Sequence, residues 1–315
     1  MALPESISSV DKGRVFLAPV TVSGATLPTA YTFASGGAVA AGAGTISLDI
    51  ATVDGAAASS ETVELETGQP ILFPSTNAVS VDGTSAIGDF KLDVDDGSNA
   101  LPTNLIAVGD YIKFAGDTQL YLVVERTTGA AEYSIRVNPA LVATPADNAV
   151  VTVYNRVKLA LAGATQFVDV NTTPASVAVT GVTYPMADGA ESLTTYAYKQ
   201  LLGITEITPS PGIESTEVSN MLFTAELTAD NTFSIGITGQ KVLGDSARRE
   251  VLMPRAFNKV TNKAMYALYE SLDGDLIEGP ANLTEGDVTS AKGDVEEYSF
   301  TLGITLGDNF NAVIR

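Results

Sequence analysis

The chain is dominated by short stretches in which apolar and polar residues alternate, and YSFTLGITL (298–306) is the clearest of them. Every second residue from Tyr298 to Leu306 is apolar, and the residues between them are serine, threonine or glycine. A period of two predicts a β-strand with one apolar face and one slim polar face. Similar stretches predict strands at 13–20, 44–50, 61–66, 89–94, 110–116, 119–125, 132–137, 149–154, 157–163, 221–228 and 232–239. Turn-forming residues separate these stretches, as is typical of an all-β protein.

One segment, PRAFNKVTNKAMYALYESLDG (254–274), has apolar residues at the three- and four-residue steps of a helix. Pro254 suits a first helical turn, and Gly274 can close the last turn in a left-handed cap. The sequence therefore predicts one α-helix, at about 254–272.

The first half of the chain contains an internal repeat. ISLDI (46–50) followed by LETGQPILF (65–73) matches FKLDV (90–94) followed by IAVGDYIKF (106–114). Leu48 corresponds to Leu92, Gly68 to Gly109 and Phe73 to Phe114, which indicates a repeated supersecondary unit, with chance similarity between strands as the alternative.

Two stretches rich in small residues, 35–44 and 161–192, have the composition of linkers. They predict that a β-rich domain at 36–157 is inserted into a second domain formed by 1–35 and 158–315.

Composition then restricts the chemistry. The 37 acidic residues outnumber the 17 basic ones, and the net charge of −20 disfavours binding to nucleic acid or to an anionic membrane. The chain has no cysteine and no histidine, which excludes disulfides, thiolate or histidine metal sites and the Ser–His–Asp and Cys–His nucleophile systems. A structural protein without a cofactor is therefore expected, and a glycosidase built on paired carboxylates is a poor alternative with 7% aromatic residues and no tryptophan.

No signal peptide is recognisable in MALPESISSVDKGR (1–14), and no apolar run reaches the length of a membrane span. We therefore expect synthesis and folding in a cytoplasm, with no membrane partner.

Two motifs were weighed as ligand sites. LDVDDGSNA (92–100) offers Asp93, Asp95, Asp96 and Asn99, but its spacing departs from a calcium loop and favours a solvated turn. SGGAVAAGAG (35–44) lacks the strand–helix context of a phosphate-binding loop. Neither motif predicts a metal or cofactor.

Charge is unevenly distributed near the C-terminus. A basic segment contains Lys241, Arg248, Arg249, Arg255, Lys259 and Lys263. An acidic segment follows, with Glu270, Asp273, Asp275, Glu278, Glu285, Asp287, Asp294, Glu296 and Glu297 against Lys292. Head-to-tail pairing of these segments between copies is one hypothesis, with Asp273, Asp275, Glu278, Glu285 and Asp287 as its acidic partners, and charge balance within one chain is the alternative.

The C-terminal elements, taken in order, resemble the tail tube (major tail) proteins of tailed bacteriophages. They are TTYAYKQLLGITEITPSPGIESTEVSNMLFTAEL (194–227), TFSIGITGQKV (232–242), the predicted helix and GDVEEYSFTLGITLG (293–307). The last is similar to the G-D-V-x-x-Y/W-S-F-T-L run of the family's closing strand. The resemblance covers about 158–315, with the strand at 13–20, while 36–157 resembles the additional β-domains that some tail proteins display outward.

This resemblance implies a tail-tube-type β-sandwich or barrel that forms stacked hexameric rings in the virion tail. It implies self-association, contacts with other tail proteins (tape measure, terminator and possibly a sheath), and viral DNA as a transient cargo. A ring of six copies would carry six times the charge of −20, so DNA would not adhere to its acidic channel. Ser299, Thr301 and Thr305 would face the channel or a neighbouring strand.

The segment TEITPSPGIESTEVSNM (205–221) is too long for a hairpin turn and is predicted to be a functional loop. Our hypothesis is that this loop, with Pro209, Pro211, Glu214 and Glu217, reaches the neighbouring ring.

The main alternative function is a capsid decoration or other virion surface protein, and a secreted adhesin or surface-layer module is a weaker one.

Overall fold

The computed structural model divides the chain into two compact units. Unit 1 is formed by Met1–Pro28 and Tyr198–Ala312, and unit 2 by Thr29–Ala197. The structure describes residues 13–19, 28–58, 62–97, 105–129, 132–160, 165–169, 175–219, 224–257, 264–271, 276–289 and 296–305. Strands dominate both units, which confirms the all-β fold class.

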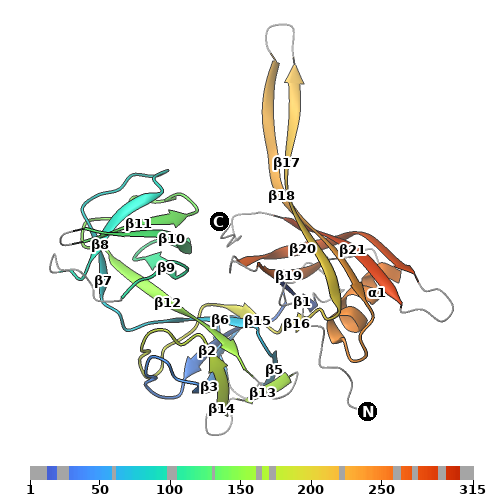
Figure 1. Cartoon of the computed structure of the whole chain (residues 1–315), viewed down its shortest axis with the longest axis horizontal. Helices are drawn as coiled ribbons and strands as arrows, with labels where there is room; N and C mark the ends of the chain where they lie inside the picture. Colours follow the sequence, from blue (N-terminus) through green and yellow to red (C-terminus); the bar gives the residue numbers. More distant parts are fainter. Residues whose placement is uncertain are drawn as a thin grey trace. The chain divides into compact units, whose positions relative to one another are not determined.

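Unit 1 contains one antiparallel seven-stranded sheet in the order β16–β1–β19–β20–β21–β18–β17 (Figure 1). Its strands are β1 (Arg14–Pro19), β16 (Lys199–Gln200), β17 (Ile204–Ser219), β18 (Thr224–Gln240), β19 (Ala264–Glu270), β20 (Leu276–Thr289) and β21 (Glu297–Thr305). β1 and β16 are antiparallel neighbours, with Leu17 opposite Lys199. Unit 2 is therefore inserted between two strands that lie side by side in unit 1.

One face of this sheet is covered by a short helical segment. The segment consists of η2 (Ala247–Leu252), which has π-helical hydrogen bonding, and α1 (Met253–Phe257). Ala247, Val251 and Leu252 are buried in the same hydrophobic core as the apolar sides of β18 and β21. Pro254 has no N–H, so it cannot donate the next helical hydrogen bond, and this interrupts the regular ladder where the two helical types meet.

The predicted extent of the helix, about 254–272, is wrong. α1 is described only to Phe257, and Ala264–Glu270 form strand β19 between β1 and β20. Met265 and Ala267 face the core of unit 1, and Tyr266 and Leu268, which alternate with them, are buried as well. When both faces of a segment are apolar, the spacing of its apolar residues does not distinguish a strand from a helix. Here the pairing with neighbouring strands determines the structure.

The predicted loop at 205–221 is also wrong in its structure. β17 pairs with β18 along the whole of Ile204–Ser219 and forms a long hairpin. Among the described residues, β21 pairs with β18 from Thr232 to Gln240 only, and the rest of the hairpin extends beyond the sheet as an arm (Figure 1). We call Ile213–Ser219 and Thr224–Asn231 the arm; it is held by pairing between its own two strands.

Unit 2 contains two small barrels that share strand β12. The first six strands are β2 (Ala30–Ser35), β3 (Thr45–Val53), β4 (Ala56–Ala57), β5 (Thr62–Glu66), β6 (Pro70–Pro74) and β7 (Val79–Asp82). The others are β8 (Lys91–Asp95), β9 (Tyr111–Phe114), β10 (Tyr121–Thr128), β11 (Tyr133–Asn138), β12 (Val150–Leu159), β13 (Thr165–Asp169), β14 (Ala175–Thr180) and β15 (Thr195–Tyr196). The order β12–β7–β8–β11–β10–β9 returns to β12, which closes one barrel without free edges.

The other barrel follows the order β12–β14–β3–β2–β15, with β6 on the opposite edge of β12. The Leu193 amide donates to the Leu72 carbonyl at 2.8 Å, and the Gln69 side chain donates to the Tyr196 carbonyl at 2.9 Å. These two hydrogen bonds join the chain beside β15 to β6. Each barrel has its own hydrophobic core.

The sequence repeat corresponds to equivalent positions in the two barrels. Gly68 and Gly109 both have positive φ angles, of 83° and 94°, in the turn before a strand that pairs with β12. Phe73 and Phe114 then occupy the same place in their respective cores. The positive φ explains why glycine recurs at this position of both copies.

The boundaries between the units differ from those predicted. The sequence placed them at 35/36 and 157/158, whereas the structure places them at 28/29 and 197/198. Residues 158–197 belong to unit 2 because β14 pairs with β3 and β12. The small-residue stretch 35–44 is part of unit 2 as well, where Val39 and Met186 form an antiparallel bridge. Among the described residues, no helix is long and apolar enough to cross a membrane.

Candidate assembly surface

The slim polar side of β21 belongs to a larger uncovered face of unit 1. Tyr298, Phe300 and Leu302 point into the core, so Ser299 and Thr301 lie on the opposite side. β17, β18 and β20 continue this side with small polar or acidic residues at the paired positions. We call it the open face, made of Glu206, Thr208, Ser210, Ser234, Gly236, Thr238, Asn282, Glu285, Asp287, Glu297, Ser299, Thr301 and Gly303.

The open face carries negative charge only. Its ionisable residues are Glu206, Glu285, Asp287 and Glu297, and all four are exposed. The remaining positions are glycine, serine, threonine and asparagine, which present hydroxyl and amide groups without bulk. A polyanion that passed along this surface would meet repulsion and few groups that could bind it.

The four strands of the open face have unpaired edges on both sides. β17 is the last strand of the sheet, so its outer edge has no partner among the described residues. On the other side, β19 pairs with β20 only from Leu276 to Asn282, and within the described chain the segment Leu283–Thr289 pairs with β21 alone. Unpaired strand edges are sites where another chain can add a strand.

The hairpin of β17 and β18 begins at a root, at the end of the sheet opposite the arm, where several specific hydrogen bonds hold it. The Tyr298 hydroxyl donates to the Leu202 carbonyl at 2.7 Å, and the Asp245 carboxylate accepts the Leu202 amide at 3.2 Å. Asp245 also accepts the Arg248 amide at 2.9 Å, which satisfies a free donor at the start of η2. One buried carboxylate therefore connects the helical segment to the start of β17.

Burial raises the pKa of Asp245 to about 6, although the two backbone amides and the Arg248 guanidinium favour its ionised form. The desolvation cost is therefore larger than the gain from these partners.

Three of the predicted basic residues are paired within the chain. Lys241 Nζ lies 2.8 Å from a Glu296 carboxylate oxygen, and Arg248 contacts the other oxygen of Glu296. Arg249 Nη2 lies 2.6 Å from Glu250. For these residues the structure favours the alternative of charge balance within one chain.

The other members of the predicted charge pairs are distributed as follows. Arg255 is buried and donates to the Val251 carbonyl at 2.9 Å, so it belongs to the helical segment. Lys259, Lys263, Asp273 and Asp275 lie outside the described residues. Glu285 and Asp287 lie on the open face.

Glu278 has a different environment from Glu285 and Asp287. It lies on β20 and accepts a hydrogen bond from the Tyr198 hydroxyl. Burial raises the pKa of the Glu278 carboxyl to about 7, and the hydrogen bond from Tyr198 opposes this shift. A carboxyl held in this way fits a structural role better than a role as an exposed assembly charge.

Of the predicted loop residues, Pro209, Pro211, Glu214 and Glu217 all lie on β17. Ser299 and Thr301 lie on the open face, and Thr305 is the last residue of β21. The sequence did not identify Tyr298 or Asp245 as root residues, because their partners come from distant parts of the chain.

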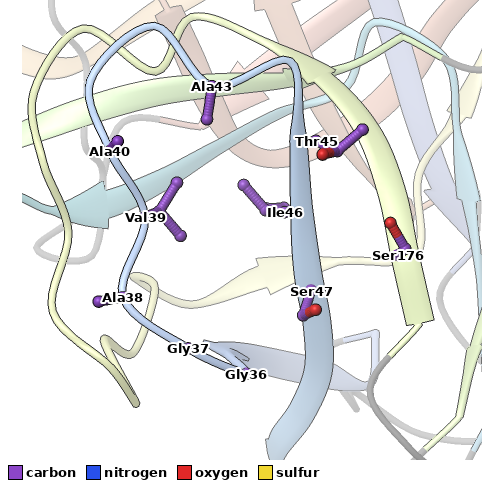
Figure 2. Close-up of a pocket in the computed structure, with 10 residues that line it drawn as sticks. All are labelled: Gly36, Gly37, Ala38, Val39, Ala40, Ala43, Thr45, Ile46, Ser47 and Ser176. Carbon is purple, nitrogen blue, oxygen red and sulfur yellow. The ribbon is translucent and has the colours of Figure 1, made fainter.

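A cavity of about 300 Å³ in unit 2 lies under the small-residue stretch that follows β2. Figure 2 shows Val39 and Ile46 pointing toward each other across it, with Ser47 and Ser176 at one side. None of its lining residues is ionisable.

In the neighbouring barrel, Asp95 of the motif 92–100 accepts the Gly97 amide at 2.8 Å and the Ser80 hydroxyl at 2.7 Å, which is the geometry of a turn.

No protein-family model and no curated protein matches the chain. Two solved structures are similar to part of it. A chain from the tail of an empty gene transfer agent particle, computed with C6 symmetry, is 14% identical at a TM-score of 0.30, covering 38% of this chain and 89% of that chain. A chain from the virion of a native gene transfer agent particle is 13% identical at a TM-score of 0.29, covering 37% and 89%.

Proposed function

We propose that the chain is a structural virion protein whose unit 1 forms stacked rings of a phage tail tube. One observation carries this proposal: among the described residues, the four strands β20–β21–β18–β17 have unpaired edges on both sides and an uncovered face of small polar and acidic residues. A sheet with two free edges is completed when each edge meets the opposite edge of another copy. The resemblance of residues 194–307 to tail tube proteins supports the same reading.

Ring closure follows from the two different edges. The outer edge of β17 in one copy meets the Leu283–Thr289 edge of β20 in the next, so the contact is heterologous. A heterologous contact that closes after a fixed number of copies gives a ring, and the tail tube resemblance implies six. The open faces of the copies then line a common channel, as in a barrel whose strands come from several chains.

The channel would be strongly negative. Glu206, Glu285, Asp287 and Glu297 repeat in every copy without a basic residue on the same face. Genome DNA is repelled by such a wall and stays mobile, which suits passage rather than binding. No enzymatic activity is required for this role.

The arm supplies a contact between rings in this proposal. The sequence of its two strands contains Glu214, Glu217, Glu226 and Asp230 and no basic residue. The arm extends beyond the part of the hairpin that the sheet supports. It can therefore reach a second layer of copies. Unit 2 would be displayed on the outside of the tube, and other tail proteins would contact the ends of the tube.

The arm can be tested without disturbing the core. Residues 213–231 are replaced by Asn-Gly, which forms a two-residue turn between the paired residues Gly212 and Thr232. We expect a folded protein that forms rings but no tubes, because every core residue of the sheet that the structure describes as buried remains. Circular dichroism and negative-stain electron microscopy measure these two properties.

Microscopy of the unmodified protein tests the function itself. Hollow tubes or sixfold rings support the proposal, and trimers without a bore would favour a capsid decoration protein instead. Tubes of normal length from the shortened-arm variant would contradict the role of the arm while leaving the tube intact.

A further inference from the structure

The outer edge of β17 contains two prolines at alternate positions. Pro209 and Pro211 lie opposite Ile235 and Phe233 of β18, and the pairing around them is regular from Ile207 to Ile213. A proline can occupy a ladder only where its nitrogen faces away from the paired strand. The nitrogens of Pro209 and Pro211 therefore face the outer edge, which no described strand covers.

The alternation of an antiparallel ladder assigns the neighbouring groups as well. Residues that exchange hydrogen bonds with β18 alternate with residues whose N–H and C=O point outward. Ile207 and Ile213 lie an even number of residues from the two prolines, so their backbone N–H and C=O groups also point outward. The outer edge therefore offers amide donors at Ile207 and Ile213, and lacks them at the two intervening positions.

Unit 2 contains a related arrangement, with prolines four residues apart, at a strand whose outer edge receives a partner. On β6 the backbone groups of Pro70, Leu72 and Pro74 point to the same edge of the strand. The other edge of β6 pairs with β12. Between the prolines, the Leu72 carbonyl accepts the Leu193 amide at 2.8 Å. The prolines on either side of Leu72 have no N–H to donate, so the contact at this edge of β6 is limited to a short stretch.

We propose that Pro209 and Pro211 end the ladder that a second copy of this chain makes with β17. This inference rests on the proposed function. The Leu283–Thr289 edge of the second copy's β20 pairs with β17 at the root, Ile204–Thr208, and cannot continue past the two missing donors. The arm is thereby left outside the ring and remains available for the next ring.

Hydrogen exchange of single amides, measured by fragmentation mass spectrometry on assembled and dissociated protein, tests this directly. In the wild type we expect assembly to slow exchange of the Ile207 amide about tenfold or more and to leave the Ile213 amide unchanged. The double variant Pro209→Thr and Pro211→Thr restores both donors. In its assemblies, exchange at 209, 211 and 213 should slow as well.

The matched control is Ser210→Thr, which introduces the same side chain at a position whose N–H already faces β18. It should keep the wild-type exchange pattern. Equal protection of Ile207 and Ile213 in wild-type assemblies would overturn the inference, and so would an Ile213 amide that stays unprotected in the double variant. Assembly without this pattern leaves the tube proposal standing, whereas failure of the wild type to assemble contradicts both.

The wild-type measurement decides the question even if the double variant does not fold. It requires no substitution, and it compares two amides of one strand in the same sample.

Discussion

At the scale of single residues, Tyr298 fixes the start of β17 to the sheet. Its hydroxyl donates to the Leu202 carbonyl, and its ring lies so close to Gly239 that a Cβ there would come within 2.4 Å of ring atoms. The Arg248 guanidinium lies 5.6 Å from the centre of the same ring. One side chain of β21 thus contacts β18, the start of β17 and the helical segment, and glycine is required at 239.

Tyr298→Phe tests this role. The variant keeps the ring but leaves the Leu202 carbonyl without the hydroxyl donor, so the free energy of unfolding should fall by about 1–2 kcal/mol. Urea denaturation measures the change. Ser299→Ala, on the exposed side of the same strand, should change stability by less than about 0.5 kcal/mol. Equal effects of the two substitutions would argue against the hydrogen bond.

At the scale of elements, the helical segment and the hairpin are joined through Asp245. Its carboxylate accepts amides from both Leu202 and Arg248 while it is almost fully buried. Among described side chains, Arg248 and Tyr298 are the charged or titratable groups that bear on it, and Glu296 and Lys241 lie behind Arg248. The position of the hairpin root therefore depends on an ionisable group.

The pKa of Asp245 predicts a pH dependence. The folded value of about 6 is above the ordinary value of 3.8, so the folded state binds this proton more readily than the unfolded state. The Asp245 contribution to stability should therefore fall as the pH rises from about 4 to about 6, by on the order of 3 kcal/mol, and stay constant above. Asp245→Asn should remove this part of the slope in denaturation curves measured across that range.

Tyr298→Phe is the control for that experiment, because it loosens the same root without removing a carboxylate. It should lower stability and retain the wild-type slope. If Asp245→Asn and the wild type show parallel pH profiles, the raised pKa is wrong.

At the scale of the whole molecule, unit 2 is an insertion between paired strands. Because Leu17 lies opposite Lys199, the chain leaves and re-enters unit 1 at neighbouring positions. Insertions of this kind leave the host core intact, since both ends of the insertion are already close together. Each unit has its own hydrophobic core.

Excision of unit 2 tests this organisation. Replacing residues 20–197 with a four-residue Gly–Ser loop joins β1 to Tyr198 and retains the Tyr198–Glu278 hydrogen bond. We expect a folded unit 1 with β-type circular dichroism and one cooperative thermal transition. An unfolded or aggregated product would show that unit 1 depends on unit 2.

Much of the sheet structure could be predicted from alternation alone. The stretch 298–304 has a strict period of two, and it forms β21 with its apolar residues in the core. The glycines of the repeat were also informative, because a positive φ before a strand restricts the choice of residue. Net charge and the absence of histidine and cysteine excluded whole classes of chemistry before any fold was known.

Tertiary structure decided what local patterns could not. Residues 264–270 are apolar on both faces, so only pairing with β1 and β20 made them a strand rather than a helix. Residues 205–219 are mostly polar and contain two prolines, so the local sequence does not favour a strand. They form one because β17 pairs with β18 along its length. The sequence by itself determined the all-β class and the acidic balance, since these follow from composition and short-range period. Which edges stay unpaired and which charges are neutralised depends on residues far apart in the chain, and only the fold brings those together.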